Sequence, residues 1–252
     1  MAETDVFQGL DPQVKFRTKK MMMWFIVFAV LMLFAGVTSA MIVLHGKLLW
    51  VHIVPPTAFW VSNVLIVLSS GTLILALRSL RRGAQSMALL FTALTFVLGL
   101  SFAISQHNGW QTLKARNAGS YTYENEQGLK ATKWNTVGKM LGTYDQDFWI
   151  EMKGQKLILE NGEYYIPTQP DSPVTNTVMT TFNASAAMLS ILVYIHIIHL
   201  ILGLAYMLRL LWRLKTGFIN SQNQVSLYTA GVYWHFLGIL WLYLFAFVFY
   251  LY

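Results

Sequence analysis

Five long stretches without a charged side chain constrain this chain more than any other feature of its sequence. About 20 apolar residues cross a bilayer as a helix, because each residue rises about 1.5 Å through a hydrocarbon core about 30 Å thick. Backbone amides in hydrocarbon must be bonded within their own segment, so the sequence predicts an all-α membrane protein with five transmembrane helices. The stretches are Met21–Leu44, Pro55–Leu77, Ala84–Ser105, Thr180–Leu208 and Ser226–Tyr252.

Composition agrees with this class and excludes several others. Of the 252 residues, 56% are hydrophobic and only 12% are charged, about half the charged share of a soluble domain. The net charge of +7 suits anionic lipid headgroups, and no basic run is interleaved with stacking aromatic residues, so we expect no nucleic-acid partner. Because the chain has no cysteine, disulfides, iron–sulfur clusters and thiolate metal sites are excluded.

The basic residues predict the orientation of the helices. They cluster in the N-terminal arm and in the second and fourth connections, whereas the first connection has only Lys47. The positive-inside rule therefore places the N-terminus in the cytoplasm and the C-terminus outside. The predicted organisation is a cytoplasmic arm at 1–20, helices at 21–105, an external loop at 106–178 and helices at 179–252. The clustered residues are Lys15, Arg17, Lys19, Lys20, Arg78, Arg81, Arg82, Arg209, Arg213 and Lys215.

The external loop carries a β signal in its second half. Phe148–Met152, Lys156–Glu160 and Glu163–Ile166 are rich in β-prone residues and are separated by Lys-Gly and Asn-Gly pairs. Asn-Gly between such runs is the strongest short signal for a hairpin, so we expect a small β-meander. Two interpretations stay open, a solvated loop packed on the helix ends and a docking surface for a neighbouring subunit.

Three histidines fall within predicted spans, where an ionisable residue is a candidate for function. His196 and His199 are three residues apart and share one helix face, so they cannot take opposite axial positions on one iron. His199 and His235 lie at similar predicted depths and could form a cross-helix haem pair. The alternatives are interhelical hydrogen bonds and proton handling. His45, His52 and His107 lie at or beyond the ends of the predicted spans, where a histidine needs no functional explanation. A metal site within the spans lacks a third ligand.

Other polar and small residues in the spans predict helix packing. The second span holds several residues that could hydrogen-bond to a neighbouring helix, and small residues four apart, such as Gly99 and Ala103, permit close approach. No nucleophile–base pair, phosphate loop or acid pair is present, so we expect no catalytic site in this chain. The polar residues are Ser62, Asn63, Ser69, Ser70 and Thr72, and the other small pairs are Ala35/Ser39 and Gly36/Ala40.

The last span resembles a known family. Residues 233–245 read Tyr-Trp-His-Phe-Leu-Gly-Ile-Leu-Trp-Leu-Tyr-Leu-Phe, similar to the final helix of haem–copper oxidase subunit III, which reads Tyr-Trp-His-Phe-Val-Asp-x-x-Trp-Leu-x-Leu-Phe. Residues 196–204 resemble the family's His-Gly-x-His-x-x-x-Gly helix. Five spans in this orientation match the short prokaryotic form. The motif residues are His196, His199, Tyr233, Trp234, His235, Phe236 and Trp241.

This sequence departs from the family pattern at three carboxylates. The family's Asp in the last helix is Gly238, and the Glu before Trp110 is Gly109. The family's intramembrane Glu has no counterpart in residues 28–34. Any role of these acids in proton entry is therefore not carried over to this chain.

The resemblance implies a non-catalytic accessory subunit that supports assembly, stability and sustained proton uptake of a proton-pumping terminal oxidase. It implies haem and copper in partner subunits, no redox cofactor or metal here, bound phospholipid as a candidate ligand, and a multi-pass protein of the bacterial inner membrane. The implied partners are oxidase subunits I and II, with subunit IV and a respiratory supercomplex as further candidates. The alternatives are a haem-b membrane anchor using His199 and His235, and a small transporter, which the lack of intramembrane acids disfavours.

Overall fold

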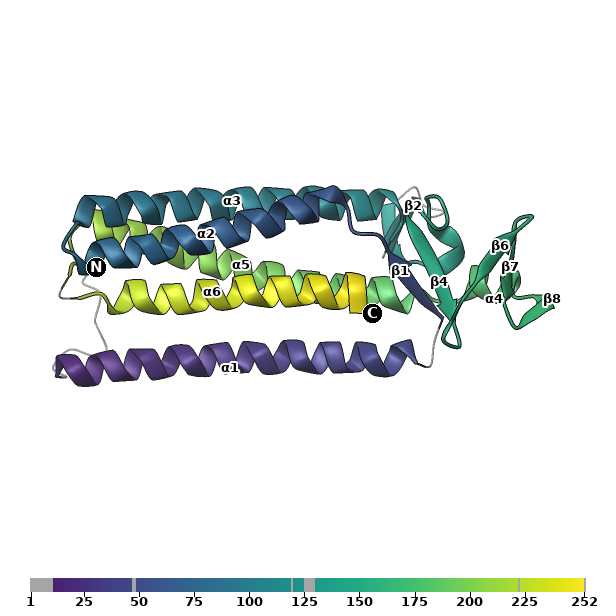
Figure 1. Cartoon of the computed structure of the whole chain (residues 1–252), viewed down its shortest axis with the longest axis horizontal. Helices are drawn as coiled ribbons and strands as arrows, with labels where there is room; N and C mark the ends of the chain where they lie inside the picture. Colours follow the sequence, from purple (N-terminus) through teal and green to yellow (C-terminus); the bar gives the residue numbers. More distant parts are fainter. Residues whose placement is uncertain (1–10, 47–48, 119, 125–129, 222, 252) are drawn as a thin grey trace. The chain divides into compact units, whose positions relative to one another are not determined.

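Five long helices make up most of the structure, a computed structural model that describes residues 11–46, 49–118, 120–124, 130–221 and 223–251. All five are long and apolar enough to cross a membrane, which confirms the predicted fold class for the described residues. The helices are α1 (Pro12–His45), α2 (Thr57–Arg81), α3 (Gln85–Ala115), α5 (Ala184–Lys215) and α6 (Val225–Ala246), which continues as a π-helical turn, η2 (Phe247–Leu251) (Figure 1).

The helices extend beyond several of the predicted boundaries. The predicted arm at 1–20 is helical from Pro12 onward, as expected for a proline in a first turn. The third helix continues past Ser105 to Ala115, because hydropathy marks the edge of the membrane and not the end of a helix. Of the predicted positions, Lys47 and Tyr252 lie outside the described residues.

The fourth predicted span, Thr180–Leu208, corresponds to α5, which begins at Ala184 and continues to Lys215. A short helix, α4 (Thr175–Thr180), precedes α5. The side chain of Asn183 then accepts a hydrogen bond of 3.1 Å from the backbone N–H of Ala186. This is the geometry of an N-cap, which satisfies a free amide at a helix start and so fixes where α5 begins.

The structure forms two compact units, and each long helix contributes residues to both. The first unit contains Met1–Leu33, Val64–Ser101 and His199–Leu240, and the second contains Phe34–Asn63, Phe102–Ile198 and Trp241–Tyr252.

In the first unit, contacts join the ends of helices that the basic clusters predict to share one side of the membrane. The Gln85 side-chain amide donates to the carbonyl oxygens of Leu214 (3.0 Å) and Ile219 (2.6 Å), which connects the start of α3 to the end of α5. The Lys20 ammonium lies 5.8 Å from the centre of the Tyr228 ring, which joins α1 to the start of α6. These contacts bring the helix ends next to the basic clusters together, and the side of the membrane that they face stays a prediction.

The segment between α3 and α5 contains the predicted strands in a different arrangement. The strands β4 (Phe148–Met152) and β7 (Glu163–Ile166) have the predicted bounds. The Lys153-Gly154 and Asn161-Gly162 pairs all have positive φ angles between 50° and 83°, as a type I′ hairpin turn requires.

The predicted strand Lys156–Glu160 is interrupted, so the three predicted strands do not form one meander. Leu157 is only 1% exposed and separates β5 (Gln155–Lys156) from β6 (Ile158–Glu160). The Leu157 N–H still donates to the Ile150 carbonyl oxygen of β4 at 2.9 Å. Beyond Leu157 the chain leaves β4, so β5 pairs with β4, whereas β6, β7 and β8 (Gln169–Pro173) form a separate antiparallel meander.

Two further pairings were missed from the sequence. The connection between α1 and α2 contains a strand, β1 (Trp50–Ile53), which pairs antiparallel with β4 and completes the sheet order β1-β4-β5. A second hairpin joins β2 (Ser120–Glu124) to β3 (Lys130–Trp134). A four-residue strand carries too little periodicity to stand out beside a long apolar helix.

Candidate functional site

The first part of the family motif on α6 packs within the first unit. Trp234 is 1% exposed, and its indole N–H donates to Ser69 Oγ at 3.0 Å. Ser69 Oγ in turn donates to the carbonyl oxygen of Ile66, one turn back on α2, at 2.8 Å. The serine hydroxyl thus binds the indole N–H of Trp234 on α6 and the carbonyl oxygen of Ile66 on α2. In lipid hydrocarbon these groups have few other hydrogen-bond partners.

Glycine makes the space that the motif aromatics occupy. A Cβ atom added at Gly99 would lie 2.7 Å from the Trp234 ring, closer than real Cβ contacts come. A Cβ added at Gly203 would lie 3.2 Å from Leu237 and 3.4 Å from Tyr233. The predicted close helix approach is therefore confirmed at Gly99, and a large aromatic side chain on α6 fills the gap.

Of the remaining motif residues of this unit, Tyr233 is buried and the others lie nearer the surface. The Tyr233 hydroxyl donates to the carbonyl oxygen of His199 at 3.2 Å. His199, His235 and Phe236 are half-buried. The contact ties α6 to α5 through the backbone of His199, and a haem pair formed by His199 and His235 stays a prediction.

The second part of the motif forms an aromatic cluster in the second unit. Trp241 is 3% exposed and its indole N–H donates to Asn63 Oδ1 at 2.8 Å. Its ring lies 5.3 Å from the ring of His196, 5.8 Å from Phe59 and 5.9 Å from Phe102. His196, which is 2% exposed, is therefore a packed residue of this cluster, and a hydrogen-bonding role for it stays a prediction.

Four of the five predicted polar residues of α2, all except Ser70, are given interhelical hydrogen bonds by the structure. Besides Asn63 and Ser69, Ser62 Oγ accepts from the Gln106 amide at 2.6 Å, and the hydroxyls of Thr72 and Thr95 lie 2.8 Å apart. Each such bond contributes about 0.6 kcal/mol on average in a membrane and up to about 1.7 kcal/mol. They position α2 against its neighbours.

Comparison with known proteins shows which family these helices resemble. The family model described as cytochrome c oxidase subunit III matches residues 174–252, which contain α4, α5, α6 and the whole of the motif. The chain is also similar to the cytochrome c oxidase subunit 3 of Alkalihalophilus pseudofirmus, with 36% identity over 58 residues. Residues 174–252 of this chain are therefore similar to the cytochrome c oxidase subunit III family. The similarity to that relative covers 23% of this chain and 28% of the length of the relative.

The segment that matches the subunit III family model contains α6, the helix of the two motif tryptophans. Both motif tryptophans use their single N–H donor on a side chain of α2, Trp234 on Ser69 and Trp241 on Asn63. The motif is therefore a packing element that connects α6 of this chain to α2.

The structure gives a physical reason for two departures from the subunit III pattern. A Cβ at Gly109 would lie 2.5 Å from the Phe59 ring, and one at Gly238 would lie 3.2 Å from Ile66. A carboxylate side chain in place of Gly109 needs the Phe59 ring to move, and one in place of Gly238 has little room. At both positions, close packing leaves little room for the carboxylate of the family pattern.

Proposed function

We propose that this chain is the non-catalytic subunit III of a proton-pumping haem–copper terminal oxidase in the inner membrane of a bacterium. In this role it supports assembly, stability and sustained proton uptake, while haem and copper reside in partner subunits. The family match over residues 174–252 is the observation that carries the proposal. The use of the motif side chains in helix packing supports a structural role for them.

The proposed partners are oxidase subunits I and II, with subunit IV, a respiratory supercomplex and bound phospholipid as further candidates. Exposed apolar surface supports this part of the proposal. Only 28% of the membrane-spanning window is buried within the chain in each of α1, α2 and α3, against 44% in α5 and 50% in the last span. Extensive apolar helix faces therefore remain for lipid and for a neighbouring subunit.

Deleting the chain from its native membrane tests the proposal. We expect the haem absorption spectrum of the remaining oxidase to be unchanged, because the redox centres belong to other subunits. We expect activity to decline over many turnovers, because a helical surface of the partner is uncovered and proton uptake is no longer sustained. Restoring the intact chain is the control and should restore endurance.

Loss of the haem signal from a fully assembled oxidase on deletion would contradict the accessory role. The haem-b anchor makes the opposite prediction for the purified chain, which would then show a Soret band that disappears in His199→Ala. His107→Ala is the matched control, because His107 lies on α3 and contacts Gln111 of the same helix, at 3.2 Å.

A further inference from the structure

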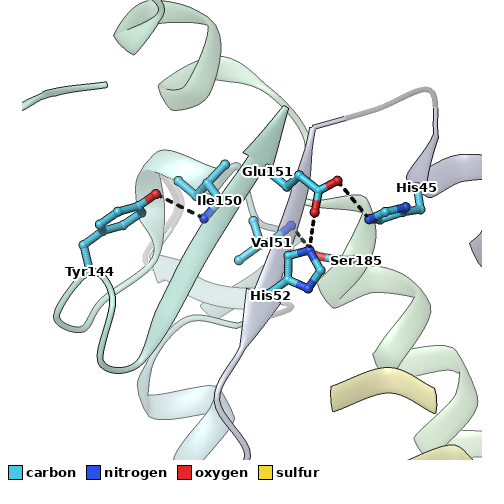
Figure 2. Close-up of polar contacts among 7 residues, drawn as sticks. All are labelled: His45, Val51, His52, Tyr144, Ile150, Glu151 and Ser185. Carbon is cyan, nitrogen blue, oxygen red and sulfur yellow. Dashed lines mark hydrogen bonds and ion pairs between the residues drawn. The ribbon is translucent and has the colours of Figure 1, made fainter. Parts of the chain in front are cut away.

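Two histidines and a glutamate converge beside the sheet of the second unit. His45 is the last residue of α1, His52 lies in β1 and Glu151 lies in β4. The two oxygens of the Glu151 carboxylate face different imidazoles, with Oε1 3.5 Å from His45 Nε2 and Oε2 3.0 Å from His52 Nε2 (Figure 2). One ligand atom from each of the three side chains lies within 4.8 Å of the others.

The pairing of β1 with β4 places two of these side chains on one face. His52 is opposite Trp149 and Trp50 is opposite Glu151 in the antiparallel register. Because side chains alternate along a strand, positions 50 and 52 share a face with positions 149 and 151. His52 and Glu151 are thus diagonal neighbours held by the backbone hydrogen bonds of the ladder, and their separation does not depend on flexible loops.

Aromatic rings fix the orientation of both imidazoles. The His52 ring stacks on Trp149 with centroids 3.6 Å apart and an interplanar angle of 6°. The His45 ring meets Trp50 edge to face at 5.3 Å and 83°. Residues whose rotamers are locked in this way lose little entropy when they bind a common ligand.

The surroundings suit a metal ion that arrives from solution. The side chains of His45, His52 and Glu151 are 22%, 18% and 18% exposed, so they are reachable yet largely desolvated.

We propose that His45, His52 and Glu151 form a binding site for a divalent transition-metal ion, and that Zn²⁺ is the ion whose ligand preference and geometry fit these donors. Donors about 2.0–2.1 Å from a tetrahedral zinc ion lie about 3.3 Å from each other. The distance from His52 Nε2 to Glu151 Oε2, 3.0 Å, and that from His45 Nε2 to Glu151 Oε1, 3.5 Å, lie on either side of that value. Two imidazoles and one carboxylate are a known zinc donor set, with water in the fourth position, whereas Ca²⁺ and Mg²⁺ prefer oxygen ligands alone.

Such an ion would fasten the end of α1 to the external sheet. Its three ligands come from three elements, α1, β1 and β4, of which β4 is more than a hundred residues distant from α1 along the chain. All three residues lie outside the segment that matches the family model. The site is therefore a property of the external part of this chain and is independent of the role in an oxidase.

Metal titration of the full-length chain in detergent tests this proposal. The chain is stripped with a chelator, dialysed and titrated with Zn²⁺, and bound zinc is measured by elemental analysis after equilibrium dialysis. We expect about one zinc per chain, and at least tenfold weaker binding in His52→Ala and Glu151→Gln, since even loss of an outer-shell partner costs about 10- to 100-fold. His107→Ala is the matched control and should bind zinc like the wild type.

Cobalt supplies a second measurement that an accidental surface site would not produce. Co²⁺ in a tetrahedral site of nitrogen and oxygen ligands gives visible absorption bands, which should appear on titration of the wild type and be absent in Glu151→Gln. His45→Gln is a second ligand variant, and circular dichroism shows that each variant retains its helices. Absence of zinc binding to the wild type would show that the three residues form an ion pair without a metal and would overturn the proposal. Equal zinc binding in the wild type and all folded ligand variants would also overturn it, because the zinc would then be bound elsewhere.

Discussion

Replacing Trp241 should separate the packing of the motif helix from its hydrogen bond. The side chain is 3% exposed and surrounded by the rings of His196, Phe59 and Phe102. Trp241→Ala removes this aromatic body and leaves a cavity, for which the expected cost in unfolding free energy is about 3–5 kcal/mol. Trp241→Phe keeps most of the body and loses only the N–H bond to Asn63, so its expected cost is about 0.6–1.7 kcal/mol plus a small packing term.

Unfolding of the purified chain by increasing SDS in mixed micelles, followed by tryptophan fluorescence, measures both changes. Trp212→Ala is the matched control, because Trp212 is 59% exposed and truncation of an exposed side chain changes stability by only about 0.5 kcal/mol. In the assembled oxidase, we expect Trp241→Ala to loosen the association of the chain while the haem spectrum of the remaining complex stays unchanged. Equal stabilities for Trp241→Ala and Trp212→Ala would refute the buried cluster.

Three further predictions follow from particular contacts. Gly99→Ala should destabilise the chain, because the new methyl group meets a tryptophan ring at 2.7 Å, whereas Gly36→Ala, with nothing within 4 Å, should be neutral or stabilising by helix propensity; the same SDS titration compares them. A topology reporter fused after Tyr252 should be active outside the cytoplasm and one in the connection between α5 and α6 should be active inside; activity of both on one side would exclude five spans. Burial raises the pKa of Tyr144 to about 12, so the stabilisation that its protonated hydroxyl gives the folded state is complete below the unfolded pKa of about 10 and is lost as pH rises toward 12. The difference in unfolding free energy between the wild type and Tyr144→Phe should therefore shrink from about pH 10 to about pH 12, and a constant difference would contradict this prediction.

The motif and the membrane helices could be predicted from sequence because their signals are local. A charge-free run of sufficient length can satisfy its backbone in hydrocarbon only as a helix, whatever the rest of the chain does. The Asn161-Gly162 turn was equally predictable, since two successive positive φ angles suit these residues. The break at Leu157 was not, because a lone leucine in a β-prone run does not indicate that its side chain will turn into the core.

The sequence alone determined the class of this protein, the five candidate membrane spans of its described residues, and the motif tryptophans and histidine that resemble subunit III. Only the tertiary structure decided what those residues contact: Trp234 with Ser69, Trp241 with Asn63, and His196 within an aromatic cluster. It alone also brought Glu151 to His45 and His52. The physical reason is that hydropathy and turn propensity act over a few neighbouring residues. The partners of a buried donor or a candidate metal ligand depend instead on which distant segments the pairing of strands and the packing of helices bring together.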